Sequence, residues 1–124
     1  MANVAALLWE FLPDVNWTGF YRVVDGALVL GPFQGKAACI RIPFGKGVCG
    51  TAAATGTTQL IDDVHAFPGH IACDANSASE LVVPVMRDGK VIAVIDLGSP
   101  NLNRFDAEDA KGIELLASML ADRI

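Results

Sequence analysis

Residues 80–97 read ELVVPVMRDGKVIAVIDL, and this stretch decides the fold. Two near-continuous apolar runs, 80–87 and 90–97, meet at Asp88-Gly89. An Asp-Gly pair favours the two-residue turn of a β-hairpin, because both turn positions need a positive φ. Apolar residues on both faces of a strand are typical of a strand inside a sheet. The stretch therefore predicts an antiparallel hairpin at the centre of a sheet, buried on both faces.

An earlier Asp-Gly pair predicts a second hairpin. Asp25-Gly26 joins the aromatic and β-branched runs 18–24 and 27–33. Because hairpins outnumber strand–helix–strand crossovers, the pattern predicts an α+β fold, with a central antiparallel β-sheet of about five to six strands flanked by helices. The other predicted elements, in chain order, are a helix over 4–12, a strand over 40–42, a helix over 47–55 ending at Gly56, a strand over 59–61, and a last helix. Asp106 is the predicted N-cap of this last helix, with Asp109 near position N3. Its predicted core-facing residues are Ile113, Leu116 and Leu120.

Length and composition narrow the class of protein. The chain has 124 residues, a net charge of −5 and three cysteines. This length fits a single domain, 1–124, and three cysteines do not suit a disulfide-built secreted scaffold. The acidic balance disfavours nucleic acid as a partner. The chain shows neither a signal peptide nor an apolar run long enough for a membrane span, so we expect a cytoplasmic protein with no membrane partner.

Residues 62–79 form a long segment without sustained periodicity. Long loops inside compact domains often carry function, and this one contains His65, His70 and Cys73. Cys73 follows no metal-binding spacing and lies in a polar stretch, which favours a redox or nucleophilic role over simple burial. Cys49 lies in a helix of small residues, where a buried and inert thiol is the common alternative. The cysteine and histidine spacing does not predict a metal site.

Two acids interrupt apolar strands. Glu80 opens one strand of the later hairpin, and Asp96 lies near the end of the other. Each carboxylate either caps a neighbouring loop or faces a ligand, and the sequence leaves both alternatives open. Trp17 and Tyr21 share one strand face by the period of two, where they either pack in the core or line a pocket.

Residues 45–50, GKGVCG, lack the spacing of a phosphate-binding loop and predict a tight entry into the second helix. The backbone N–H groups at that helix start could hold a carboxylate. Lys46 could assist there, or it could be a solvated lysine.

Three cysteine-bearing motifs carry a family resemblance. Residues 30–39 (LGPFQGKAAC), 45–50 (GKGVCG) and 69–74 (GHIACD) closely resemble the free methionine-(R)-sulfoxide reductases built on a GAF domain. The similarity runs from about Asn3 to the end of the chain, and it implies a GAF-like fold that is short at its N-terminus relative to the family. Relatives are often dimers, so a homodimer is expected.

The resemblance implies a role for each cysteine in an oxidative-repair enzyme. Cys73 matches the nucleophile that attacks the sulfoxide sulfur, which releases methionine and leaves a sulfenic acid. Cys39 matches the thiol that condenses with the sulfenic acid to a redox-active disulfide, and Cys49 an auxiliary or alternative resolving thiol. A thioredoxin-type or other dithiol reductant would then reopen the disulfide, and no bound cofactor or metal is implied. This sequence of steps is ordinary sulfur chemistry.

The resemblance also implies a substrate pocket, with one departure. Trp17, Tyr21, Glu80 and Asp96 match the positions that line it. Family members usually read Leu-Asp-Ile-Asp-Ser where this chain has IDLGS at 95–99, so Gly98 replaces a second pocket acid. A missing acid catalyst can lower a rate by orders of magnitude.

Three hypotheses follow. The first is a thiol-dependent reductase of free methionine-(R)-sulfoxide, with activity weakened at Gly98. The second is a non-catalytic GAF module that binds methionine or another small molecule. The third is a thiol redox sensor in which Cys39 and Cys73 form a reversible disulfide.

Overall fold

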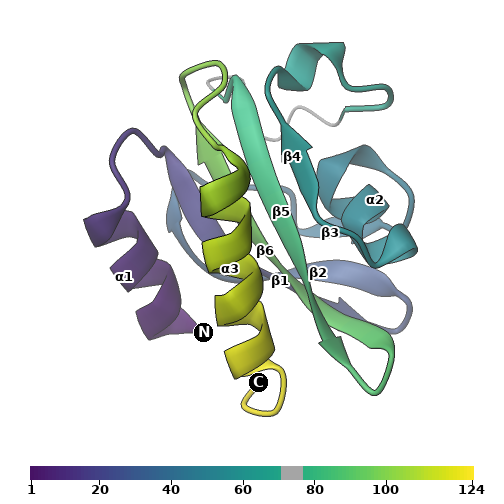
Figure 1. Ribbon diagram of the computed structural model, residues 1–124. Helices are drawn as coiled ribbons and strands as arrows, with labels where there is room; N and C mark the ends of the chain where they lie inside the picture. The colour runs from purple at the N-terminus through teal and green to yellow at the C-terminus, as the bar shows by residue number, and fades with distance from the viewer. Residues whose placement is uncertain (71–76) are drawn as a thin grey trace.

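The computed structural model describes residues 1–70 and 77–124. In these residues a six-stranded antiparallel sheet has the order β3-β2-β1-β6-β5-β4, with helices on both faces (Figure 1). This arrangement confirms the predicted α+β fold. The helices are α1 (Ala2–Phe11), α2 (Gly47–Thr55) and α3 (Ala107–Leu120), with a 3-10 turn η1 (Val64–Ala66); the strands are β1 (Trp17–Val24), β2 (Ala27–Gly35), β3 (Arg41–Pro43), β4 (Gln59–Ile61), β5 (Ser79–Arg87) and β6 (Lys90–Ser99).

Both predicted hairpins are present, and the backbone conformation of their turn residues explains why they form. Asp25 and Gly26 have φ values of 51° and 78°, and Asp88 and Gly89 have 52° and 75°. Two successive positive φ values give the turn whose twist matches that of the strands it joins. The hairpins β1–β2 and β5–β6 therefore form where the sequence places them.

The two hairpins join through β1 and β6, which lie at the centre of the sheet. β5 lies next to the short edge strand β4, so only one strand of the later hairpin is central. Burial on both faces is nonetheless confirmed, because residues 81–85 and 93–95 are buried throughout.

The alternation of side chains along the strands divides the core into two layers. Leu81 and Val83 point to the face covered by α1 and α3, where they pack in one cluster with Phe20. Val82 and Val94 point to the opposite face, where they pack against α2. Figure 1 shows α1 and α3 over the near face of the sheet and α2 beside β3 and β4. Glu80 and Asp96, two positions from Val82 and Val94, share the α2 face.

The ends of α2 and α3 follow the sequence signals. α2 ends at Gly56, whose left-handed φ of 66° provides a glycine C-cap as predicted. α3 begins with a capping box, in which Asp106 and Asp109 each accept from the backbone N–H of the other. Within α2, a Cβ on Gly50 would lie 2.5 Å from the carbonyl oxygen of Pro43. The absence of a side chain at Gly50 therefore allows α2 to sit directly on the connection from β3.

The long segment after β4 is partly structured. η1 begins after Asp63, whose side chain accepts a hydrogen bond from the backbone N–H of His65. β5 already begins at Ser79, one residue before the predicted start. Cys73 lies outside the described residues.

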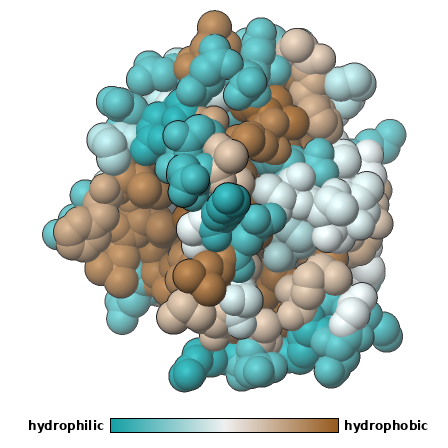
Figure 2. Space-filling view, in the orientation of Figure 1, coloured by the Kyte–Doolittle hydropathy of each residue, from teal (hydrophilic) through white to brown (hydrophobic). Residues whose placement is uncertain are grey.

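Part of the surface is apolar. Figure 2 shows apolar side chains gathered over the side that carries α1, where Leu7, Trp9 and Phe11 are exposed. Within the described residues, none of the helices combines the length and apolarity needed to cross a membrane.

Candidate functional site

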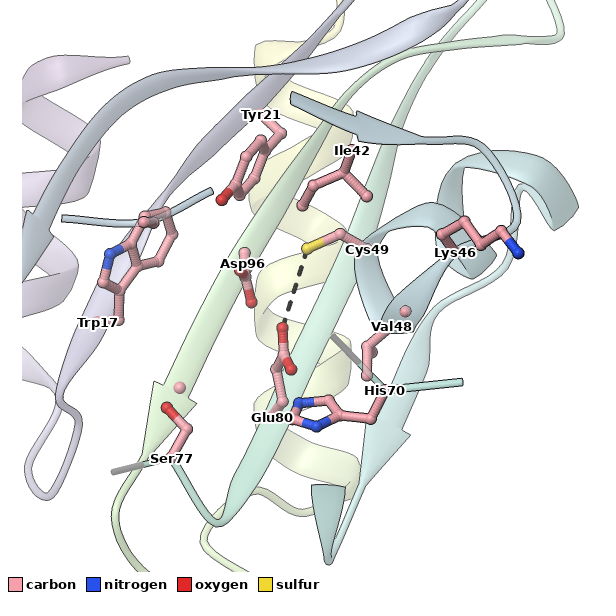
Figure 3. Close-up of a pocket in the computed structure, with 13 residues that line it drawn as sticks. Trp17, Tyr21, Ile42, Lys46, Val48, Cys49, His70, Ser77, Glu80 and Asp96 are labelled. Carbon is pink, nitrogen blue, oxygen red and sulfur yellow. Dashed lines mark hydrogen bonds between the residues drawn. The ribbon is translucent and has the colours of Figure 1, made fainter. Parts of the chain in front are cut away.

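A small cavity lies between the α2 face of the sheet and the start of α2 (Figure 3). Its volume is about 60 Å³. A single water needs about 10–15 Å³ by this measure, so the cavity suits a small molecule and not a nucleotide. The described residues that line it are Trp17, Tyr21, Ala38, Ile42, Lys46, Gly47, Val48, Cys49, His70, Ser77, Glu80, Asp96 and Gly98.

Strand pairing gathers the acidic end of the cavity. Glu80 on β5 pairs with Gly98 on β6, and Asp96 pairs with Val82 one step along the same face. In Figure 3 the two carboxyl groups and the Cys49 thiol point toward one another. The Cys49 Sγ lies 3.9 Å from the Glu80 Oε2 to which it donates. One donor atom from each of these three residues lies within 4.8 Å of the others.

Burial opposes charge at this acidic end. Desolvation, followed by the nearby Asp96 carboxyl, raises the pKa of Glu80 well above its ordinary value. Desolvation also raises the pKa of Asp96, against hydrogen bonds that lower it. Two carboxyl groups this close do not both ionise readily, so the pair keeps a proton at pH values where exposed acids have lost theirs. The pair therefore holds a proton that it can offer to a ligand.

The charges of the lining side chains determine which ligands the cavity could bind. Lys46 is the single Lys or Arg among the described lining residues, and Figure 3 shows its side chain directed away from the two acids. A ligand cation would therefore meet uncompensated carboxyl groups, which suits an ammonium group. Cys49, Glu80 and Asp96 could also hold a metal ion. However, desolvation and the two acids raise the pKa of the Cys49 thiol, which disfavours the thiolate that a metal requires.

Two aromatic rings form the opposite wall. Trp17 and Tyr21 stack with ring centroids 5.9 Å apart, so the predicted shared face is confirmed. Phe33 also stacks with Trp17, with ring centroids 5.2 Å apart. The polar ends of the rings hold the backbone beyond β2. Trp17 Nε1 donates to the Lys36 carbonyl oxygen and the Tyr21 hydroxyl to the Cys39 carbonyl oxygen, each at 3.0 Å.

The start of α2 forms a third wall. Gly47, Val48 and Cys49, the first three residues of the helix, line the cavity. Their N–H groups belong to the first turn, which has no acceptors within the helix, and the helix dipole makes this end positive. The tight entry predicted from residues 45–50 is present: the Gly45 N–H donates to the Gly50 carbonyl oxygen at 2.8 Å. The cavity thus places a helix start that favours anions near two carboxyl groups.

The three cysteines differ in their surroundings. Cys49 is buried within α2, so the expectation of a buried thiol is confirmed. Cys39 is half-buried, and it lies between β2 and β3 next to the lining residue Ala38. The candidate nucleophile Cys73 falls outside the described residues, so its position relative to the cavity is not part of the described geometry.

Comparison with known proteins identifies the family. The sequence matches the GAF domain family over residues 1–124. It is 54% identical over 120 residues to the free methionine-R-sulfoxide reductase of Escherichia coli (strain K12), covering 97% of this chain and 73% of that protein. The chain belongs to the free methionine-R-sulfoxide reductase family. Solved structures of other members agree with this assignment.

Two family structures share the fold closely. The reduced form of the Staphylococcus aureus fRMsr has a TM-score of 0.94 at 50% identity, over 98% of this chain and 79% of that one. The Neisseria meningitidis free methionine-R-sulfoxide reductase, solved in complex with its substrate, also has a TM-score of 0.94 at 50% identity, over 98% and 74% of the two chains. The predicted family and its GAF fold are therefore both confirmed.

The sequence predicted the acidic and aromatic residues of the cavity but not all the residues that line it. Trp17, Tyr21, Glu80 and Asp96 all line it, as does Gly98. His70 and Ser77 also line it, although the sequence singled out neither for this position. Desolvation, and then His65, lowers the pKa of His70, which favours a neutral imidazole at the cavity. The only sequence signal for both residues was their place in the long segment before β5.

Proposed function

We propose that this chain reduces free methionine-(R)-sulfoxide to methionine, with Cys73 as the nucleophile. The observation that carries the proposal is a cavity that combines two protonation-coupled acids, an aromatic wall and a helix start, in a member of this reductase family. A free amino acid carries an ammonium and a carboxylate within a few bonds, and the two ends of the cavity complement these charges. The relatives solved with substrate support a small-molecule ligand.

The ligand would bind by charge at one end and by shape at the other. Its ammonium group pairs with the single negative charge of Glu80 and Asp96, and the start of α2 favours its carboxylate. The methylsulfinyl group lies against Trp17 and Tyr21. A methionine sulfoxide within a peptide lacks both free charges and would leave the cavity's charged groups unpaired, so the free amino acid is preferred.

The proposed reduction is a two-electron transfer from sulfur to sulfur. The Cys73 thiolate attacks the sulfoxide sulfur while the proton shared by Glu80 and Asp96 passes to the sulfoxide oxygen. The sulfur–sulfur bond that forms displaces the oxygen as hydroxide. The hydroxide then attacks the Cys73 sulfur, and the sulfur–sulfur bond breaks with its electron pair going to the substrate sulfur. Methionine is released and Cys73 becomes a sulfenic acid. Cys73 is oxidised by two electrons and the substrate sulfur is reduced by two.

Resolution then uses a second thiol. The Cys39 thiolate attacks the sulfur of the Cys73 sulfenic acid and forms a disulfide, and the departing hydroxide takes up a proton and leaves as water. We assign this role to Cys39 ahead of Cys49, because burial and the two neighbouring acids keep the Cys49 thiol protonated by raising its pKa. Cys49 remains an auxiliary thiol that donates to Glu80. A thioredoxin-type dithiol would reduce the disulfide and complete the cycle.

The test incubates the protein with racemic free methionine sulfoxide and dithiothreitol and follows both enantiomers by chiral chromatography. Selective loss of the R form with equimolar release of methionine is expected, and Cys73→Ser should abolish both. Cys49→Ser, as a matched thiol control, should retain most of the rate. Unchanged R enantiomer, or undiminished turnover in Cys73→Ser, would contradict the proposal.

Gly98 favours a second candidate function, a binding module without turnover. It lines the cavity at the position where the family resemblance predicts another acid. In that case free methionine or its sulfoxide would raise the melting temperature of the protein without any release of methionine from the sulfoxide. The chromatographic assay separates this outcome from catalysis.

A further inference from the structure

Residues 36–46, KAACIRIPFGK, form a cationic segment in an acidic chain. The chain carries fourteen acidic residues against nine basic ones, yet this segment contains no acid and three cations. Lys36, Arg41 and Lys46 are all exposed. The segment runs from the end of β2 through β3 to the start of α2, and it includes Cys39. In the sequence, exposed cations therefore lie on both sides of Cys39, one of the two cysteines that the proposed disulfide joins.

The backbone of this segment is anchored from the inside. Trp17 and Tyr21 donate to the carbonyl oxygens of Lys36 and Cys39. The Leu30 N–H donates to the Ile40 carbonyl oxygen at 2.9 Å. These hydrogen bonds fix the segment against the aromatic wall of the cavity. Its side chains are therefore presented on a rigid backbone, which lowers the entropy lost on binding a partner.

Two large apolar side chains lie exposed on the segment. Ile40 is 74% exposed and Phe44 is 38% exposed. They flank β3, in which Ile42 is buried between the exposed residues Arg41 and Pro43. β3 is also an edge strand that pairs only with β2 among the described strands. Exposed apolar side chains next to cations at a sheet edge are typical of a protein-binding surface.

We propose that residues 36–46 are the docking surface for a protein dithiol reductant with an apolar rim and negative charge around its reactive cysteine. The inference rests on the proposed function, which requires such a protein to reach the Cys39–Cys73 disulfide. Ile40 and Phe44 contact the apolar rim, and Lys36 and Arg41 face the negative charge. A second copy of this chain fits the surface less well, because a symmetric contact would bring two cationic segments together.

The docked complex would carry out thiol–disulfide exchange. A thiolate of the reductant attacks the Cys39 sulfur, and Cys73 leaves as a thiolate that takes up a proton. The second thiol of the reductant then attacks the mixed disulfide and releases the Cys39 thiolate. The protein disulfide gains two electrons and the reductant loses two, becoming a disulfide itself.

The experiment compares a protein reductant with a small one on peroxide-oxidised protein, so it requires no sulfoxide turnover. Reduction is followed with thioredoxin, thioredoxin reductase and NADPH in one arm and with dithiothreitol in the other. Ile40→Ser and Arg41→Glu should each raise the KM for thioredoxin by about fivefold or more, the usual effect of losing an interface anchor. Their rates with dithiothreitol should stay within about twofold, because a small dithiol needs no docking surface.

Matched controls change an exposed aliphatic residue and an exposed cation elsewhere on the surface. Leu115 and Lys111 are exposed on α3, so Leu115→Ser and Lys111→Glu should leave the KM for thioredoxin unchanged. Added salt should raise that KM for the native chain and have less effect on Arg41→Glu.

The outcomes separate docking from catalysis. An unchanged thioredoxin KM in both variants, equal losses with both reductants, or failure of the oxidised protein to accept electrons would overturn the docking proposal. Selective loss with thioredoxin supports it, even where the chromatographic assay finds no sulfoxide reduction and the proposed function fails.

Discussion

Glu80 is a half-buried acid, and replacing it should affect stability and activity in different ways. Its folded-state pKa is raised by desolvation, so the folded chain holds a proton that the unfolded chain releases at lower pH. Stability from this residue therefore falls as pH rises from the unfolded pKa toward the folded one. Glu80→Gln should stabilise the protein more at about pH 8 than at about pH 5, by about 1.4 kcal/mol for each unit of pKa difference.

Thermal melts at the two pH values measure this effect, and the chromatographic assay measures the loss of turnover. Glu114→Gln is a suitable control, because Glu114 is exposed on α3. A stabilisation by Glu80→Gln that does not depend on pH would contradict the coupled-proton interpretation of the pair.

Gly98 should limit the rate through a missing acid. A Cβ there would lie 3.0 Å from the Ser77 Oγ and 3.1 Å from the Asn16 Oδ1. These contacts are tight, but the Ser77 hydroxyl can turn to donate to an added carboxylate. Gly98→Asp should raise kcat/KM for the sulfoxide by about tenfold or more, within the range of acid catalysis. Gly98→Ala adds the same Cβ without the acid. An equal gain in kcat/KM for both variants would therefore show that the missing acid is not what limits the rate.

At the scale of elements, the packing of α2 against the connection that follows β3 should be the feature of the site most sensitive to substitution. Gly50→Ala would place its Cβ 2.5 Å from the Pro43 carbonyl oxygen, a backbone atom that cannot turn aside. We expect a destabilisation of about 1–3 kcal/mol, as for other overpacked cores, together with weaker substrate binding. Gly112→Ala in α3 meets nothing within 4 Å and should instead stabilise the protein by about 0.5–1 kcal/mol. Urea denaturation of both variants tests the contrast, and a neutral Gly50→Ala would show that α2 adjusts freely.

The elements predicted from the sequence are those with local signals. Asp-Gly turns specify their own backbone, and Asp106 with Asp109 specifies the start of α3, so the residues themselves are enough to predict these features. The pairing of Trp17 with Gly98 had no local signal, because it depends on hydrogen bonds between two hairpins that are distant in the chain. That pairing brings the aromatic wall to the acidic end, so the sequence could suggest the residues of the cavity but not their assembly.

At the scale of the whole molecule, the cavity joins two layers of the fold. Its walls come from the sheet on one side and the start of α2 on the other. A ligand that binds both walls should therefore stabilise the folded state as a unit. Free methionine at about one hundred times its Kd should add about 2.7 kcal/mol, which is several degrees in Tm for a domain of this size.

The charged groups of the ligand decide whether that stabilisation occurs. N-acetylmethionine amide keeps the methionine side chain but lacks the ammonium and the carboxylate. At the same concentration it should shift Tm little, because Glu80 and Asp96 would lose their cation and the start of α2 its anion. Thermal melts with each compound make the comparison, using Glu80→Gln with free methionine as a third arm that should show a reduced shift. Equal stabilisation by the blocked compound would mean that the aromatic wall alone binds the ligand, and the preference for the free amino acid would then need another cause.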